Sequence, residues 1–172
     1  MGTHVKKALI VGASKEGGFG NFLAEELKVR GTFSEVEVRR RGDSLNVEPA
    51  DMVVINLFDH KVVARLQQAV FVRAFERLRD EDCLLVVMGS TVYHFEDHVY
   101  AQSKKNLKEK FYELGKNTDT YSCRLLLIEP GTMEYVRGEP AEGAHVSYRT
   151  VANVMRFART TRQKFMHVAL RG

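Results

Sequence analysis

The stretch that decides the fold is KALIVGASKEGGFGNFLAEEL, residues 7–27. It opens with the aliphatic run Ala8–Val11, passes through a glycine-rich turn between Gly12 and Gly20, and continues with apolar residues at helical spacing. This order predicts a buried strand, a tight turn and an amphipathic helix. Glycines in such a turn let the backbone approach a phosphate, and the start of the following helix offers N–H groups and positive potential. The stretch therefore predicts a phosphate-binding turn, although a tight turn without a ligand would give the same pattern.

Further apolar runs follow along the chain, and most are continuously apolar, which is typical of strands buried on both faces of a parallel sheet. We expect strands at Ala8–Val11, Val36–Val38, Met52–Leu57, Leu84–Met88, Leu125–Ile128 and Met166–Leu170. We expect helices from Phe22 to a glycine stop at Gly31, and over Val62–Leu78, Val99–Leu114 and Ser147–Arg159. The alternation predicts a single α/β domain over residues 1–172, a doubly wound parallel (Rossmann-like) sheet of about six strands.

Two connections between these elements stand out. Only Arg39 to Asp51 separates the second strand from the third, which is too short for a crossover helix and a further strand. One βα unit is therefore expected to be missing or reduced. The stretch Val136–His145, with Gly138, Pro140 and Gly143, is expected to be a long loop at the carboxyl edge of the sheet.

The composition narrows the kind of partner. Basic residues number 26 and acidic residues 22, giving a net charge of +4, and the two signs are interspersed. This weak basic bias suits an anionic small ligand, and no basic run alternates with aromatic residues as nucleic-acid binding would require. No apolar stretch approaches the about 18 residues of a membrane span, and no signal-peptide pattern is present. We expect no nucleic-acid or membrane partner.

Two cysteines, Cys83 and Cys123, each lie in an apolar run. A buried free thiol in such a setting behaves as a small hydrophobic side chain. The pair gives no sign of a disulfide framework and fits a reducing compartment, so we expect a cytoplasmic protein.

Three consecutive arginines, Arg39, Arg40 and Arg41, end the second predicted strand. Dinucleotide-binding folds contact the adenosine ribose at this point, and guanidinium groups suit a 2′-phosphate there. The run therefore favours NADP(H) over NAD(H). Solvated strand-end charges are the alternative interpretation, and the nearby Asp43 keeps NAD(H) possible.

Tyr100 and Lys104 are four residues apart in a predicted helix, so they share one face. A carbonyl that accepts a hydride needs a proton donor, and a tyrosine with an ordinary pKa of about 10 serves near neutrality only if its phenolate is stabilised. A nearby ammonium stabilises it. Ser90 ends the preceding strand, where its hydroxyl is placed to bind a substrate oxygen. The spacing alone occurs often by chance.

Five segments stand in an order that resembles the short-chain dehydrogenase/reductase family. They are similar to its glycine turn, central strand, serine strand, tyrosine–lysine helix and Pro-Gly strand end. In sequence they read ALIVGASKEGGFG (8–20), VVINLF (53–58), LLVVMGS (84–90), YAQSKKNL (100–107) and LLIEPGTM (126–133).

The resemblance implies an NAD(P)-dependent oxidoreductase that transfers a hydride to or from a carbonyl or alcohol substrate. Tyr100 is implied as the general acid/base, Lys104 as the residue that holds the nicotinamide ribose and lowers the tyrosine pKa, and Ser90 as the residue that positions the carbonyl. The residues expected to bind NADP(H), or NAD(H), are Gly12, Ser14, Lys15, Gly18, Phe19, Gly20, Arg39, Arg40, Arg41, Asn56, Pro130, Gly131 and Thr132. The resemblance further implies a homodimer or homotetramer that pairs through the Val62–Leu78 and Val99–Leu114 helices.

Several positions depart from the family pattern. Gly12 is followed by four residues before Gly17, where the family has three. The separation between Ser90 and Tyr100 is shorter than in typical members, and Gln67 lies in the region where some members place an asparagine. These departures favour an alternative, a catalytically weak or inactive dinucleotide-binding protein with a sensing or structural role. A nucleotide-sugar-modifying enzyme shares the Tyr-x-x-x-Lys pair but normally has a larger substrate-binding portion.

A cluster of His94, Glu96, Asp97 and His98 invites a metal-site interpretation. The order lacks the HExxH spacing, and no third ligand is evident. We therefore expect no metal. Tyr93 is an alternative proton donor, but no lysine follows it at four residues.

Overall fold

The computed structural model describes residues 6–13, 17–40, 43–57, 66–91, 99–136, 139–140, 142–143 and 145–171. Its centre is a parallel sheet in the strand order β2-β1-β3-β4-β5-β8. The strands are β1 (Lys7–Ala13), β2 (Glu35–Arg40), β3 (Met52–Ile55), β4 (Leu84–Met88), β5 (Arg124–Pro130) and β8 (Phe165–Leu170). The predicted doubly wound α/β fold is confirmed, and β3 ends two residues earlier than the predicted Leu57.

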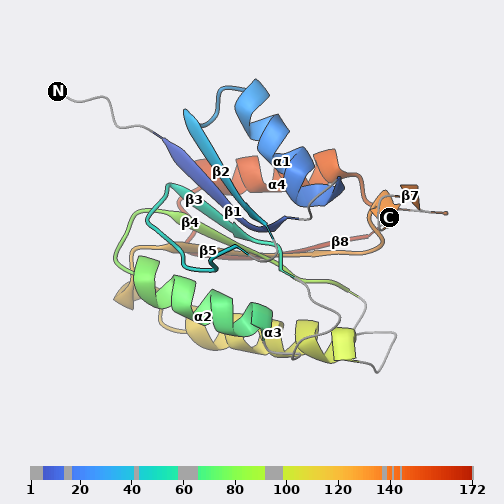
Figure 1. Cartoon of the computed structure of the whole chain (residues 1–172). Coiled ribbons are helices and arrows are strands. Elements are labelled where there is room, and N and C mark those ends of the chain that lie inside the picture. The colour runs from blue at the N-terminus through green and yellow to red at the C-terminus, as the bar shows by residue number, and fades with distance from the viewer. Residues whose placement is uncertain are drawn as a thin grey trace.

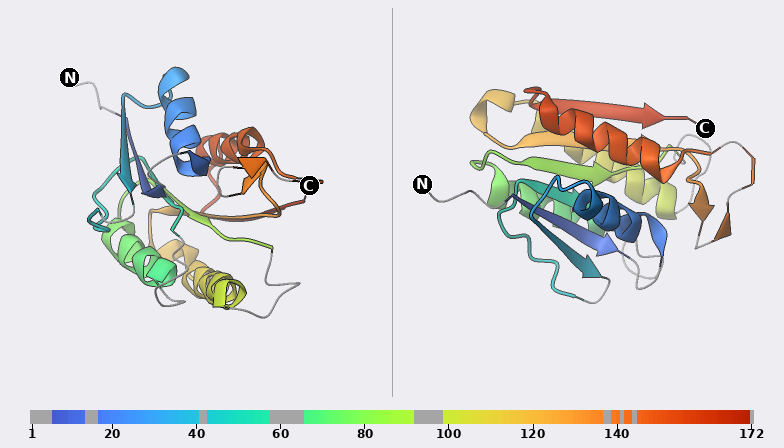
Figure 2. Two further views of the ribbon diagram at one scale, coloured as in Figure 1. Left: turned by 45° about the vertical axis from the view of Figure 1, so that its right-hand side comes forward. Right: turned by 90° about the horizontal axis from the view of Figure 1, so that it is seen from above.

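Helices cover both faces of the sheet (Figure 1). Helices α1 (Gly18–Val29) and α4 (Tyr148–Thr160) lie on one face, and α2 (Leu66–Leu78) and α3 (Val99–Gly115) lie on the other. The two views of Figure 2 show these layers from the side and from above. No helix in the described part of the chain is long and apolar enough to cross a bilayer.

Burial on both faces explains why the central strands are continuously apolar. In β1, Ala8 and Ile10 pack towards α1 and α4, whereas Leu9 and Val11 pack towards α2 and α3. Every residue of β3 and β4 is at most 3% exposed. Because burial of a large aliphatic side chain stabilises a fold by about 1.5–3 kcal/mol, these strands hold the two helical layers together.

The connection from β2 to β3 confirms the expected loss of a βα unit. Its described residues, 43–51, form neither helix nor strand. Instead Leu45, Val47 and Ala50 pack against the core on the α2–α3 side, where a crossover helix would otherwise lie. As a result β2 is an edge strand, and its valines alone, Val36 and Val38, pack into the core.

A short antiparallel pair, β6 (Tyr135–Val136) with β7 (Glu139–Pro140), occupies part of the stretch predicted as a loop at Val136–His145. The loop prediction was therefore partly wrong. Strands of two residues are too short to show a hydrophobic period, and the glycines and proline dominate the local signal. Helix α4 then begins after Ser147, whose Oγ accepts a hydrogen bond from the Thr150 N–H at 3.1 Å, a typical N-cap.

Candidate active site

The carboxyl ends of five parallel strands, β1, β3, β4, β5 and β8, lie at one edge of the sheet. Backbone hydrogen bonds fix the segments that leave these ends. The Asn56 N–H donates to the Val11 carbonyl at 2.9 Å, and the Thr91 N–H donates to the Pro130 carbonyl at 3.2 Å. Gly131 donates to the Leu170 carbonyl at 2.9 Å. Ligands of open α/β sheets bind at this edge, so the predicted residues Asn56, Pro130, Gly131 and Thr132 lie where a cofactor would be expected.

The glycine turn leaves β1 in a conformation that side chains would block. Gly12 has a φ of +94°, and a Cβ there would lie 2.7 Å from the Asn56 carbonyl oxygen and 2.8 Å from the Leu57 side chain. Gly17 and Gly18 also have positive φ, at 58° and 79°. Such backbone is favourable only for glycine, so a side chain would strain the turn at these three positions.

Helix α1 starts at Gly18, directly behind this turn, with Gly17 at the N-cap position. A Cβ at Gly20 would lie 2.9 Å from that of Ala13, so glycine here lets α1 pack closely on β1. The ring of Phe19 is buried, 5.4 Å from the Tyr148 ring between centroids, and points into the α1–α4 layer. Of the predicted cofactor residues in this turn, Ser14 and Lys15 lie outside the described residues.

The arginine run at the end of β2 divides into residues with different surroundings. Arg39 is ion-paired with Glu37 at 2.7 Å and with Glu48 at 3.3 Å, and these carboxylates raise its pKa. Arg40 is exposed, and its backbone N–H donates to the Asp43 carboxylate at 2.6 Å. Arg41 lies outside the described residues. Arg39 is thus committed to carboxylates of its own chain, while the Arg40 side chain is exposed at the strand end.

Lys104 is the most unusual ionisable group of the site. It is 4% exposed, and its Nζ donates to Gln67 Oε1 at 2.7 Å and to the Met88 carbonyl at 2.9 Å. Both acceptors are neutral, so these hydrogen bonds do not make up for the loss of water around the ammonium. Burial therefore lowers the pKa of Lys104 to about 7.

Tyr100 lies beside Lys104 on the same face of α3, with the Lys104 Nζ 5.5 Å from the centre of its ring. Burial raises the pKa of Tyr100, and a hydrogen bond with Ser90 opposes that rise. The resemblance implied that Lys104 would lower this pKa. In the structure burial is the largest influence on the Tyr100 pKa, and it raises that pKa.

The sequence matches no family model, and it matches no curated protein. Solved structures match it over almost its whole length. The alcohol dehydrogenase from the archaeon Thermococcus sibiricus, complexed with 5-hydroxy-NADP, is 15% identical with a TM-score of 0.64 over 96% of each chain. A short-chain dehydrogenase/reductase from Vibrio parahaemolyticus is 15% identical with a TM-score of 0.63 over 96% of this chain and 100% of that one.

The chain has the fold of the short-chain dehydrogenases/reductases. The same fold is found in a UDP-N-acetylglucosamine 4-epimerase from Bacillus cereus, which is 11% identical with a TM-score of 0.68 over 97% of this chain and 78% of that one.

Within the short-chain dehydrogenase/reductase fold, the structure brings Ser90, Tyr100 and Lys104 together as a connected group. One more residue, Gln67, joins this group, although no role in the site was predicted for it from the sequence. Gln67, 3% exposed, donates to the Met88 carbonyl at 2.9 Å and to the Ile55 carbonyl at 3.3 Å while accepting from Lys104. It therefore ties the lysine to the ends of β3 and β4.

A signal for Gln67 does exist in the sequence. It stands three residues before Val70 and four before Phe71, on the apolar stripe that α2 turns towards the sheet. A polar residue at such a position is buried with its partners. The sequence does not reveal that the partner is Lys104, because the two lie 37 residues apart.

Two other sequence features lie outside the described residues, namely Tyr93 and the His94, Glu96, Asp97 and His98 cluster. Among the residues that are described, no group of three or more histidine, cysteine or acidic side chains is arranged to hold a metal ion.

Proposed function

We propose that this protein is an NAD(P)-dependent oxidoreductase of the short-chain dehydrogenase/reductase type, with NADP(H) preferred, acting on a carbonyl or alcohol substrate. The observation that carries the proposal is the connected group Ser90, Tyr100 and Lys104 at the sheet edge where the glycine turn also ends. A proton donor, a hydroxyl and a cation beside a phosphate-type turn are the parts that such a reaction needs.

The residues present fit a dinucleotide. The backbone at Gly12, Gly17 and Gly18 is left-handed and carries no side chain, and a Cβ at Gly12 would clash with the Asn56 carbonyl oxygen. The N-terminus of α1 directly follows, and the positive end of a helix attracts a pyrophosphate. On this proposal the turn holds the pyrophosphate, and Asn56, Gly131 and Thr132 border the cofactor along the strand ends.

A nicotinamide dinucleotide held by these residues would supply or accept the hydride. Tyr100 Oη donates a proton to the carbonyl oxygen during reduction and takes it back during oxidation, and Ser90 Oγ binds the same oxygen. Because burial raises the pKa of Tyr100, its phenol stays protonated near neutral pH and is ready to act as an acid. For oxidation the phenolate must form, and the ammonium of Lys104 is the charge that stabilises it.

The preference for NADP(H) rests on the arginines. Arg39 is held by Glu37 and Glu48, so Arg40 is the described arginine available for a 2′-phosphate. One similar structure, the alcohol dehydrogenase, is complexed with an NADP derivative. The predicted homodimer or homotetramer stays a prediction, which light scattering tests.

The test has two stages. Calorimetry with NADPH and NADH measures cofactor binding, and a panel of ketones and aldehydes with NADPH measures turnover. Tyr100→Phe is expected to keep cofactor affinity within about 3-fold while turnover falls by about 10²–10⁴-fold. Tyr112→Phe, a change at a more exposed tyrosine of the same helix, is the matched control. If neither dinucleotide binds, the proposal is wrong.

A second function, dinucleotide binding without efficient turnover, is favoured by one observation. Lys104 Nζ is already hydrogen-bonded to Gln67 and to the Met88 carbonyl, and its charge is reduced near neutral pH. A lysine in that state stabilises a phenolate poorly. This function predicts cofactor binding that Tyr100→Phe leaves unchanged, together with no turnover by either the wild type or the variant.

A further inference from the structure

The two cysteines meet at the opposite edge of the sheet from the candidate active site. Cys83 and Cys123 directly precede β4 and β5, whose first residues, Leu84 and Arg124, are register partners. Both side chains are buried, at 1% and 0% exposure, and their sulfurs are 3.4 Å apart. The predicted free, buried thiols are confirmed, but the structure also makes them neighbours.

Backbone hydrogen bonds hold the segments that carry the two cysteines side by side. The Arg124 N–H donates to the Cys83 carbonyl at 2.8 Å, and the Cys123 N–H donates to the Arg79 carbonyl at 3.1 Å. Adjacent strands lie about 4.8 Å apart, within the 4.4–6.8 Å range between the Cα atoms of a disulfide. A disulfide bond is about 2.05 Å long, so the two sulfurs need to approach by about 1.4 Å.

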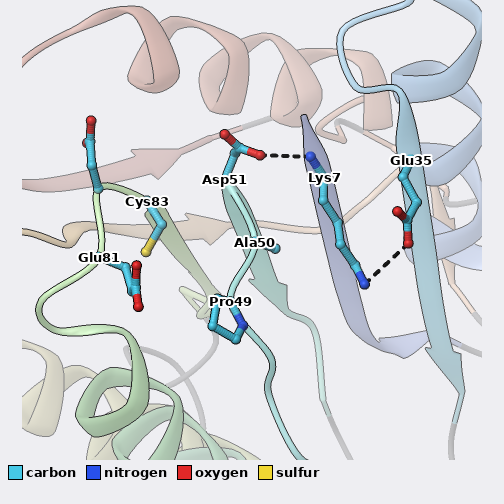
Figure 3. A pocket seen from close by; sticks show the side chains of 8 residues that line it. Lys7, Glu35, Pro49, Ala50, Asp51, Glu81 and Cys83 are labelled. Carbon is cyan, nitrogen blue, oxygen red and sulfur yellow. Dashed lines mark hydrogen bonds and ion pairs between the residues drawn. The ribbon is translucent and has the colours of Figure 1, made fainter. Parts of the chain in front are cut away.

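A pocket of about 270 Å³ reaches Cys83 from solvent (Figure 3). Its described lining includes the carboxylates of Glu35, Asp51, Glu81 and Asp82 and a single cation, Lys7. Lys7 is paired with Glu35 at 3.2 Å, so the pocket is acidic overall. Cys123 does not line it. A small molecule that enters would therefore meet Cys83 first.

The two thiols have unequal acidity. The Cys83 thiol donates a hydrogen bond to the Cys123 sulfur, which raises the pKa of Cys83 and lowers that of Cys123. The Leu85 backbone N–H and the positive charges of Arg124 and Lys164 also lower the Cys123 pKa. The pair therefore loses one of its two protons more readily than two isolated buried thiols would. The thiolate that results is the reactive form of cysteine.

We propose that Cys83 and Cys123 form a reversible oxidation site, in which hydrogen peroxide entering the acidic pocket converts the adjacent thiols into a disulfide. The pair begins with one proton, held in the hydrogen bond between the two sulfurs, so Cys123 is the thiolate. As Cys83 passes this proton to the Cys123 thiolate, the Cys83 sulfur attacks one peroxide oxygen. The S–O bond forms as the O–O bond breaks, which leaves a sulfenic acid and hydroxide. The hydroxide takes the proton from Cys123 to give water.

The Cys123 thiolate then attacks the Cys83 sulfur. The S–S bond forms, the S–O bond breaks, and the second hydroxide takes a proton from solvent. The two sulfurs lose two electrons together, and the peroxide is reduced to two molecules of water. A thiol reductant reverses the change.

The pocket selects the oxidant by charge and size. Hydrogen peroxide is neutral and little larger than water, so the acidic lining does not repel it. Glutathione disulfide is anionic and much larger, so the same carboxylates oppose its approach. The site is therefore expected to respond to peroxide and to resist disulfide exchange.

The test treats the folded full-length chain with hydrogen peroxide and then unfolds and alkylates it for mass spectrometry. The expected product is a monomer that has lost both alkylatable thiols and two hydrogen atoms, with the Cys83 and Cys123 peptides linked, and dithiothreitol restores both thiols. Glutathione disulfide at equal concentration is expected to react at least about 10-fold more slowly. Both thiols staying alkylatable, or disulfide-linked dimers as the main product, would overturn the proposal.

Single variants test the order of events. In Cys123→Ser the Cys83 sulfenic acid is expected to form more slowly than in the wild type, because the proton acceptor is lost, but to accumulate and to be trapped by dimedone. In Cys83→Ser the Cys123 thiol is expected to be lost at least about 10-fold more slowly than the Cys83 thiol of Cys123→Ser. Circular dichroism confirms that each variant is folded. Equal oxidation rates in the two variants would contradict entry through the pocket at Cys83. The readout is thiol chemistry, so it is independent of dinucleotide binding and turnover.

Discussion

Replacement of Lys104 by methionine should change how stability depends on pH. Burial lowers the pKa of Lys104 from 10.5 to about 7. Between these values the unfolded chain binds one more proton than the folded chain, so stability rises with pH by about 1.4 kcal/mol per pH unit. Below pH 7 the folded chain carries the whole cost of a buried ammonium. From pH 6 to pH 9 the wild type should therefore gain about 3 kcal/mol of unfolding free energy relative to Lys104→Met.

The assay is urea unfolding of the wild type and Lys104→Met at several pH values between 6 and 9. Subtraction of the two curves removes the other titrating groups, and the lost hydrogen bonds to Gln67 and Met88 add only a constant offset. Lys105→Met, which removes an exposed ammonium from the same helix, is the control and should give a flat difference. If the Lys104→Met difference is also flat within about 0.5 kcal/mol, the ammonium is not desolvated and the reasoning fails.

Three further predictions concern the same edge of the sheet. Gln67→Glu places a carboxylate beside the Lys104 ammonium and raises the pKa of Lys104. The gain in unfolding free energy from pH 6 to pH 9 that Lys104 causes should therefore fall below about 1 kcal/mol in the same urea experiment. A gain of about 3 kcal/mol would argue against contact between residue 67 and Lys104. Gly12→Ala should cost about 2–4 kcal/mol in urea unfolding because of its positive φ and the 2.7 Å clash, against about 1 kcal/mol for Gly31→Ala, which has open space. Equal costs would show that the clash relaxes. Arg40→Ala should weaken NADPH binding by about 10-fold or more in calorimetry and NADH binding by less than about 2-fold; equal losses would remove Arg40 from the 2′-phosphate site.

The fold was predictable because its strands carry strong, local signals. β3 and β4 are buried on both faces and read as unbroken apolar runs, and the glycine turn marks the end of β1. The missing βα unit is also visible in the local sequence of β2. In β2 the residues alternate as EVEVR over 35–39, because one face of that strand has no helix to cover it.

The site was only partly predictable, because its chemistry depends on contacts between distant residues. The sequence predicted Ser90, Tyr100 and Lys104 as the catalytic group, and in the structure Lys104 contacts the Met88 carbonyl at the carboxyl end of β4. It did not show that Gln67 would bind Lys104, and so it did not show that neutral acceptors alone would surround the ammonium. The 3.4 Å contact between Cys83 and Cys123 was equally hidden, since it arises from the pairing of β4 with β5.

The position of β2 at the edge of the sheet has a consequence for the behaviour of the protein at high concentration. An edge strand is a template for intermolecular β-pairing and aggregation. Here Lys7 of β1 bridges Glu35 at 3.2 Å and Glu37 at 2.9 Å in β2, so charged side chains line one face of the edge strand. A strand from another molecule that added to β2 would have to strip water from these charges. The shortened connection thus leaves β2 as an unpaired edge strand, and the charges on this strand oppose intermolecular β-pairing.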